Sequence, residues 1–188
     1  MRVNSIRLLI NETKKCLESE CDLSALIVAL TIPDVCGKVL FPKNRTSERY
    51  KKWFDKYIGD YEQSPFEKEL PVEERAPYMN GEVFYKLRCA MLHEGNDDIA
   101  RKIHVDEFNL MLGEKWLLGS TEVRSQRVEV LSDGSKKVHP KVVVWNVNVR
   151  DLCEKIIWAA EAFLKKEVKD SKDAPTIQVS ETYAKRLL

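Results

Sequence analysis

Arg88 and His93 are the residues of this sequence whose types and spacing best suit chemistry, and they lie in the segment 81–96, GEVFYKLRCAMLHEGN. Arginine carries a permanent positive charge, and histidine gains or loses a proton near neutral pH. On a helix that turns about 100° per residue, the direction of Arg88 falls between those of Phe84 and Leu92. A cation beside apolar neighbours needs an anionic partner. That partner is a carboxylate of this chain, a second copy of the chain, or the phosphate of a ligand.

Asp34 is the best candidate within the chain for the anion that faces Arg88. It directly follows Pro33, which we expect to break or kink an apolar helix, and it lies between Ile32 and Val35. A carboxylate in apolar surroundings favours pairing with a cation. The alternative is that Asp34 caps the helical segment that follows Pro33.

Three further residues flank the pair and are candidates for supporting roles, namely Cys89, Glu94 and Asn96. Cys89 directly follows Arg88, and its thiol can donate only a weak hydrogen bond to a phosphate. Glu94 and Asn96 follow His93, where we expect a loop that can contact a substrate. The structural alternative for His93 is a residue at a helix C-terminus whose ring meets a terminal carbonyl or the helix dipole.

A helix must position both residues of the pair. Asn80 can cap the start of this helix, and Gly95 can end it in the left-handed conformation. On a straight helix the directions of Arg88 and His93 differ by about 140°. One chain therefore brings them together only through the reach of the arginine and a loosened last turn. A second chain is the other source of the missing group.

Helical periodicity and capping residues predict the remaining helices. They are expected at residues 5–19, after a cap at Asp22, from Thr46 or Ser47, and after a cap at Asn148. The third of these carries the aromatic residues Tyr50, Trp53, Phe54 and Tyr57 at helical spacing, with lysines between them. Such a stripe is either core or a surface on which bases stack.

The region before the last helix changes to a period of two. Residues 122–131 and 138–147 alternate as strands around SDGS, which contains an Asp-Gly hairpin turn. We therefore predict a mainly α (α+β) fold, a helical bundle with an inserted β-hairpin or small antiparallel sheet before the last helix. We expect a single domain over 1–168, with the β-rich insertion at 103–147, and a flexible C-terminal tail at 169–188.

Composition limits the class of protein. The net charge is +1 with 32% charged residues, so overall basicity does not indicate nucleic-acid binding, and any RNA contact must be local. The longest apolar run, 23–32, is half the length that spans a bilayer, so we expect a cytoplasmic protein that does not enter a membrane. Five cysteines without a CxxC pattern indicate reduced thiols, and three scattered histidines predict no metal site and no cofactor.

The run LRCAMLHEG, at the end of an apolar helix that follows a helical pair, resembles the HEPN superfamily. Ribonuclease members of that superfamily carry an arginine, then four to six residues, then a histidine. The combination of IPDVCGK, KKWFDKYI and GEVFYKLRCAMLHEGN more narrowly resembles a group of uncharacterised bacterial and phage proteins with this motif. The resemblance covers about residues 23–96.

The resemblance implies a metal-independent endoribonuclease that works as a homodimer, with the two motifs meeting at the two-fold interface. His93 would exchange protons with the RNA 2′-OH or the leaving oxygen, and Arg88 would stabilise charge on the phosphoryl oxygens. A 2′,3′-cyclic phosphate would be the product. Relatives imply phage defence or a toxin–antitoxin setting, with an antitoxin partner. Cys89 occupies a position that is often polar in active members, so the alternative is a catalytically inactive module that binds a nucleotide, RNA or a partner protein.

Overall fold

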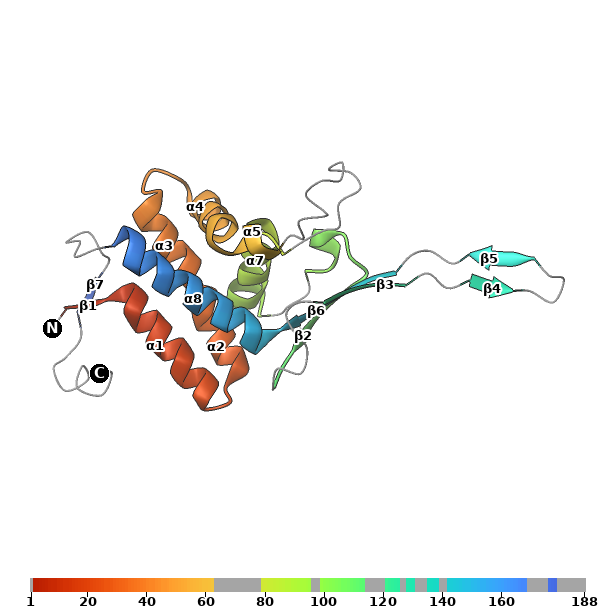
Figure 1. The fold of residues 1–188 in the computed structure, drawn as a ribbon, viewed down its shortest axis with the longest axis horizontal. Coiled ribbons are helices and arrows are strands. Elements are labelled where there is room, and N and C mark those ends of the chain that lie inside the picture. The colour runs from red at the N-terminus through yellow and green to blue at the C-terminus, as the bar shows by residue number, and fades with distance from the viewer. Residues whose placement is uncertain are drawn as a thin grey trace.

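The computed structural model describes residues 2–62, 79–95, 99–113, 121–125, 128–130, 135–138, 142–168 and 176–178. Helices dominate this part of the chain (Figure 1). They are α1 (Ser5–Glu18), α2 (Asp22–Ala29), α3 (Ile32–Leu40), α4 (Thr46–Phe54), the π-helical η1 (Asp55–Gly59), α5 (Asp60–Glu62), α7 (Gly81–Cys89), the π-helical η3 (Ala90–Glu94), the 3-10 turn η4 (Arg101–Ile103) and α8 (Val149–Glu167).

Short strands complete the fold. They are β1 (Arg2–Asn4), β2 (Glu107–Met111), β3 (Thr121–Ser125), β4 (Val128–Val130), β5 (Lys136–Val138), β6 (Val142–Asn148) and β7 (Thr176–Gln178). The strands form a three-stranded sheet in the order β2-β6-β3 and two pairs, β4-β5 and β1-β7. In Figure 1 the β4-β5 pair lies farthest from the helices, at the end of the arm that β3 and β6 begin.

Asparagine side chains begin three of the helices. Asn4 caps α1, Asn80 caps α7 and Asn148 caps α8, each by accepting hydrogen bonds from backbone N–H groups of the first turn. The predicted caps at Asn80 and Asn148 are therefore confirmed. Asp22 does not cap α2, because it is the first helical residue and its carboxylate binds elsewhere. The N-cap of α2 is Cys21, which makes no side-chain cap.

The aromatic stripe of α4 belongs to the core. Tyr50, Trp53 and Phe54 are fully buried, and the ring of Phe54 stacks on Phe84 of α7 with 4.3 Å between centroids. Phe163 of α8 meets Trp53 edge to face. The alternative in which these three rings stack on bases is therefore wrong, and the stripe instead contacts aromatic side chains of α7 and α8.

Two glycines let α4 approach its neighbours closely. A Cβ at Gly37 of α3 would lie 2.6 Å from the carbonyl oxygen of Arg49, and a Cβ at Gly81 of α7 would lie 2.5 Å from that of Lys51. Both obstacles are backbone atoms, which cannot rotate away. The backbones of α3, α4 and α7 are thus held in contact, and the side chains beside these contacts are fixed relative to one another.

Gly81→Ala is expected to destabilise the protein by about 1–3 kcal/mol, because the added methyl group forces α7 away from α4. Urea unfolding followed by circular dichroism measures the change. Lys165→Ala, on the exposed side of α8, is the control and should leave the midpoint unchanged. Equal midpoints for both variants would show that the α4–α7 contact is loose.

The predicted fold class is confirmed, since the described part of the chain is mainly helical with a small β component before the last helix. The antiparallel prediction holds for the β3-β6 and β4-β5 pairs. It is wrong for β2, which pairs with β6 in parallel. Alternation of side chains indicates a strand but not the direction of its partner, and the chain between β2 and β6 is long enough for a parallel connection.

Within the segment 169–188, for which we predict a flexible tail, the structure describes Thr176–Gln178. These residues form β7, which pairs antiparallel with β1. The pairing explains why two short polar segments at opposite ends of the sequence adopt extended structure. The other residues of this tail lie outside the described part of the chain.

One stretch is long and apolar enough to cross a membrane by length and composition. It covers Asp22–Leu40, which includes α2 and α3, and 44% of its most apolar 18-residue window is buried within the protein. A core helix of a soluble protein has the same composition. Leu26 and Ile32 are fully buried here, and the predicted break lies between Ala29, where α2 ends, and Ile32, where α3 begins one residue before Pro33. The burial of these residues fits packing in the core.

Candidate functional site

The helix that carries Arg88 and His93 changes its winding between them. The α-helical part ends at Cys89, the residues from Ala90 onward form the π-helical turn η3, and Gly95 ends it with φ of 68° in the left-handed region. A π-helical turn winds less per residue than an α-helix and occurs often at functional sites. A single chain needs a loosened last turn to bring Arg88 and His93 together, and this turn is present. Its slower winding rotates His93 towards the side of the helix that carries Arg88.

Arg88 is half-buried and only partly satisfied. Its Nε is buried and has no hydrogen-bond partner among the described residues. Its guanidinium carbon lies 6.0 Å from the centre of the Tyr85 ring, one turn earlier on α7. A stacked aromatic ring weakly stabilises a cation, but it does not replace an anion. The Nε–H of Arg88 thus has no acceptor among the described residues.

Asp34 does not neutralise Arg88, so that prediction is wrong. Its Oδ1 lies 2.7 Å from Nε of Arg49 on α4, and both side chains are largely buried. Asp34 does not cap α3 either, because Thr31 is the N-cap residue. The reason is the close contact at Gly37, which brings the Arg49 backbone against α3 one turn after Asp34. Arg49, and not Arg88, therefore forms the ion pair with the Asp34 carboxylate.

The other candidates occupy different surroundings. His93 and Glu94 are exposed. The Glu94 carboxylate forms an ion pair with Lys102 at 2.8 Å, and this contact involves neither Arg88 nor His93. Cys89 is half-buried beside Tyr85. The pKa of the Tyr85 phenol is raised, mainly by burial and then by the neighbouring Cys89 thiol. The structure thus groups Cys89 with Arg88 and leaves Glu94 apart. Asn96 lies outside the described residues.

Tyr50 and Tyr85 are part of this site, although sequence reasoning did not include them. The two rings meet edge to face, with 5.4 Å between centroids, and Lys51 Nζ lies 5.4 Å from the centre of the Tyr85 ring. Burial raises the pKa of Tyr50 far above its ordinary range, and the charge of Arg88 acts in the opposite direction. The signal for Tyr85 was its position one turn before Arg88. Tyr50 lies on another helix and gave no local signal.

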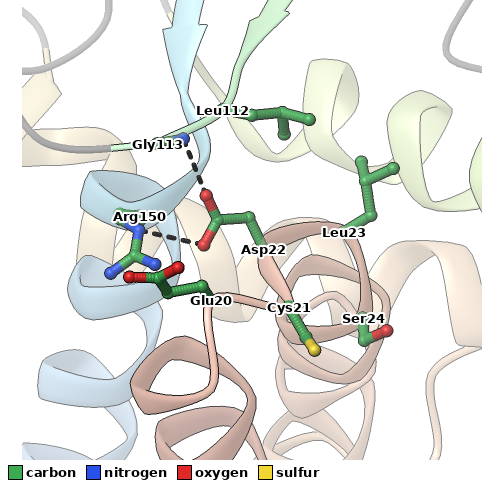
Figure 2. A pocket seen from close by; sticks show the side chains of 8 residues that line it. All are labelled: Glu20, Cys21, Asp22, Leu23, Ser24, Leu112, Gly113 and Arg150. Atoms are coloured by element: carbon green, nitrogen blue, oxygen red, sulfur yellow. Dashed lines mark hydrogen bonds and ion pairs between the residues drawn. The ribbon is translucent and has the colours of Figure 1, made fainter.

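A separate cavity of about 730 Å³ lies where α2, α8 and the end of β2 meet (Figure 2). At its wall the Asp22 carboxylate sits between Arg150, with 2.9 Å from Oδ1 to Nε, and the N–H of Gly113, which donates to Oδ2 at 2.7 Å. Leu23 and Leu112 line it with exposed apolar surface. None of the residues proposed from the sequence for chemistry lines this cavity.

The described part of the chain contains no group of three or more His, Cys, Asp or Glu side chains that could hold a metal ion. Comparisons with known protein families, with characterised proteins and with solved structures find no match to this chain. What the fold and site define is a mainly helical protein whose last two turns of one helix carry an exposed histidine and a half-buried arginine, the Nε of which has no partner among the described residues.

Proposed function

We propose that this protein is a HEPN-like, metal-independent endoribonuclease in which Arg88 and His93 are the catalytic residues. The observation that carries the proposal is the state of Arg88. Its buried Nε lacks a partner among the described residues, while the carboxylate predicted to neutralise it is held by Arg49. A phosphate oxygen is the kind of group that completes such a cation.

The reaction follows from the chemistry of the two side chains. His93 accepts the proton of the RNA 2′-OH, whose oxygen attacks the adjacent phosphorus and displaces the 5′-oxygen of the next nucleotide. Arg88 stabilises the negative charge on the phosphoryl oxygens as it builds. Protonation of the leaving oxygen completes the step, and the products are a 2′,3′-cyclic phosphate and a 5′-OH end.

We place this activity in the cytoplasm, in a homodimer whose two motifs meet at the two-fold axis. The exposed position of His93 and the half-buried position of Arg88 leave room for a second chain to contribute the group that protonates the leaving oxygen. Phage defence or a toxin–antitoxin system, with an antitoxin as partner, is the setting that we propose. Light scattering should give the mass of two chains.

His93→Ala is expected to abolish cleavage of single-stranded RNA that wild type performs in EDTA, because the general base is removed. His104→Asn is the matched control, since His104 is also exposed and its left-handed backbone, with φ of 59°, accepts asparagine. Gel analysis of labelled RNA measures both. Equal cleavage by wild type and His93→Ala would remove His93 from the mechanism.

A catalytically inactive binding module is the second candidate. The observation that favours it is Cys89, whose thiol contacts Tyr85 and adds no strong donor beside Arg88. This alternative predicts saturable binding of RNA, a nucleotide or a partner protein, without turnover. Wild-type protein that binds RNA in a salt-dependent manner and never cuts it would favour the module.

A further inference from the structure

The hydroxyl of Tyr50 is a buried polar group for which the described residues offer no partner. Tyr50 is fully buried in α4, and its oxygen makes no hydrogen bond with the described residues. Leaving a hydroxyl unsatisfied in the interior is costly, and such groups in native proteins call for a physical explanation. Phenylalanine would fill the same space without this cost. The hydroxyl therefore points to an unidentified acceptor or donor.

A second orphan group lies in the same cluster. Arg88 Nε is also buried and has no partner in the described part of the chain, and Tyr85 lies beside both residues, with its ring 5.4 Å from that of Tyr50 and 6.0 Å from the Arg88 guanidinium carbon. The guanidinium can only donate, and the phenol can donate. Two neighbouring donors without an acceptor indicate that the missing atom is an acceptor.

The charge of this cluster decides which acceptor fits. Arg88 contributes one positive charge, and Asp34, the acidic residue predicted to neutralise it, is already paired with Arg49. A half-buried cation for which no ion pair is seen among the described residues favours an anionic oxygen over a neutral one. An oxyanion such as phosphate supplies both the charge and the lone pairs.

We propose that Tyr50 and Arg88 are two donors of one oxyanion site, in which the Tyr50 hydroxyl and Arg88 Nε hold the same phosphate group. This inference deepens the proposed function and takes from it only the identity of the phosphate as part of RNA. Tyr85 and Cys89 are half-buried, and the Tyr85 ring lies beside both donors. Because Tyr50 is fully buried, phosphate binding at this site requires these side chains to move.

The test uses inorganic phosphate as the probe and thermal unfolding as the readout. Wild type, Tyr50→Phe and the control Tyr61→Phe, whose ring is exposed on α5, are unfolded over a phosphate series with chloride keeping the ionic strength constant. Phosphate should stabilise wild type and Tyr61→Phe equally. For Tyr50→Phe the apparent Kd should rise about tenfold or more, because one hydrogen bond to a charged group is lost.

Stability without phosphate separates this inference from a structural role for the hydroxyl. Tyr50→Phe should then be as stable as wild type or more stable, since an unpaired buried hydroxyl is removed. Lower stability of that variant would show that an internal water satisfies the hydroxyl, and would overturn the proposal. Equal phosphate Kd values for wild type and Tyr50→Phe, or no effect of phosphate on wild type, would also overturn it. Phosphate binding without RNA cleavage would instead contradict only the ribonuclease.

Discussion

Asp22→Ala is expected to lower the free energy of unfolding by about 3 kcal/mol, because it leaves a largely buried cation without its partner. The Asp22 side chain is 7% exposed and that of Arg150 is 23% exposed, with 2.9 Å between Oδ1 and Nε. The same carboxylate accepts the N–H of Gly113 at 2.7 Å (Figure 2). One side chain therefore joins α2, α8 and the end of β2, and its loss releases all three.

Guanidinium unfolding followed by tryptophan fluorescence and by far-UV circular dichroism measures this effect. Ser24→Ala is the matched control, because Ser24 is exposed on α2 and lines the same cavity. Its midpoint should match that of wild type. If Asp22→Ala unfolds at the same midpoint as Ser24→Ala, the Asp22–Arg150 pair does not hold the sheet to the bundle.

Arg88→Ala is expected to reduce RNA cleavage by about 10²–10³-fold, the usual effect of removing a group that stabilises charge in the transition state. The same change should cost at most about 1 kcal/mol of stability. The reason is that Nε of Arg88 makes no hydrogen bond with the described residues, so truncation removes none at that atom. Lysine at this position should not restore activity, because it lacks the planar fork of donors.

Arg49→Ala is the matched control for Arg88→Ala, and it should give the opposite result. Arg49 is neutralised by Asp34 at 2.7 Å, so its loss strands a largely buried carboxylate and costs about 2–3 kcal/mol. Cleavage at a temperature where the variant stays folded should remain close to that of wild type. Two arginines near Tyr50 would then separate into one that stabilises the fold and one that acts on substrate. Loss of cleavage in both variants to the same extent would remove this distinction.

Local features of this fold could be predicted because they depend on neighbours in sequence. The caps at Asn80 and Asn148, the end of a helix at Gly95 and the break before Pro33 follow from one or two residues each. The β3-β6 and β4-β5 pairs likewise follow from alternation around a turn. These signals were enough to define a mainly helical fold with a β-rich segment before the last helix.

Features that depend on tertiary contacts could not be predicted. Asp34 pairs with Arg49 rather than Arg88 because a glycine in α3 brings α4 close, and neither helix reveals that approach by its own pattern. The sequence predicts Asp22 as a helix cap. Its carboxylate instead accepts the N–H of Gly113, which follows β2 and lies 91 residues later in the sequence. The burial of Tyr50 beside Arg88 is of the same kind. In each case the packing of separate elements of the fold determines which groups contact one another.

Removing the 2′-OH at the cleavage position tests most directly the reaction that we propose for Arg88 and His93. Two single-stranded RNAs that differ only by a 2′-deoxy sugar at the cut site are incubated with wild type in EDTA, and the new ends are identified by mass spectrometry. The all-ribose strand should be cut to a 2′,3′-cyclic phosphate and a 5′-OH end, and the 2′-deoxy strand should stay intact at that position. Cleavage of both strands at equal rates, or a new end without the cyclic phosphate, would contradict attack by the 2′-OH.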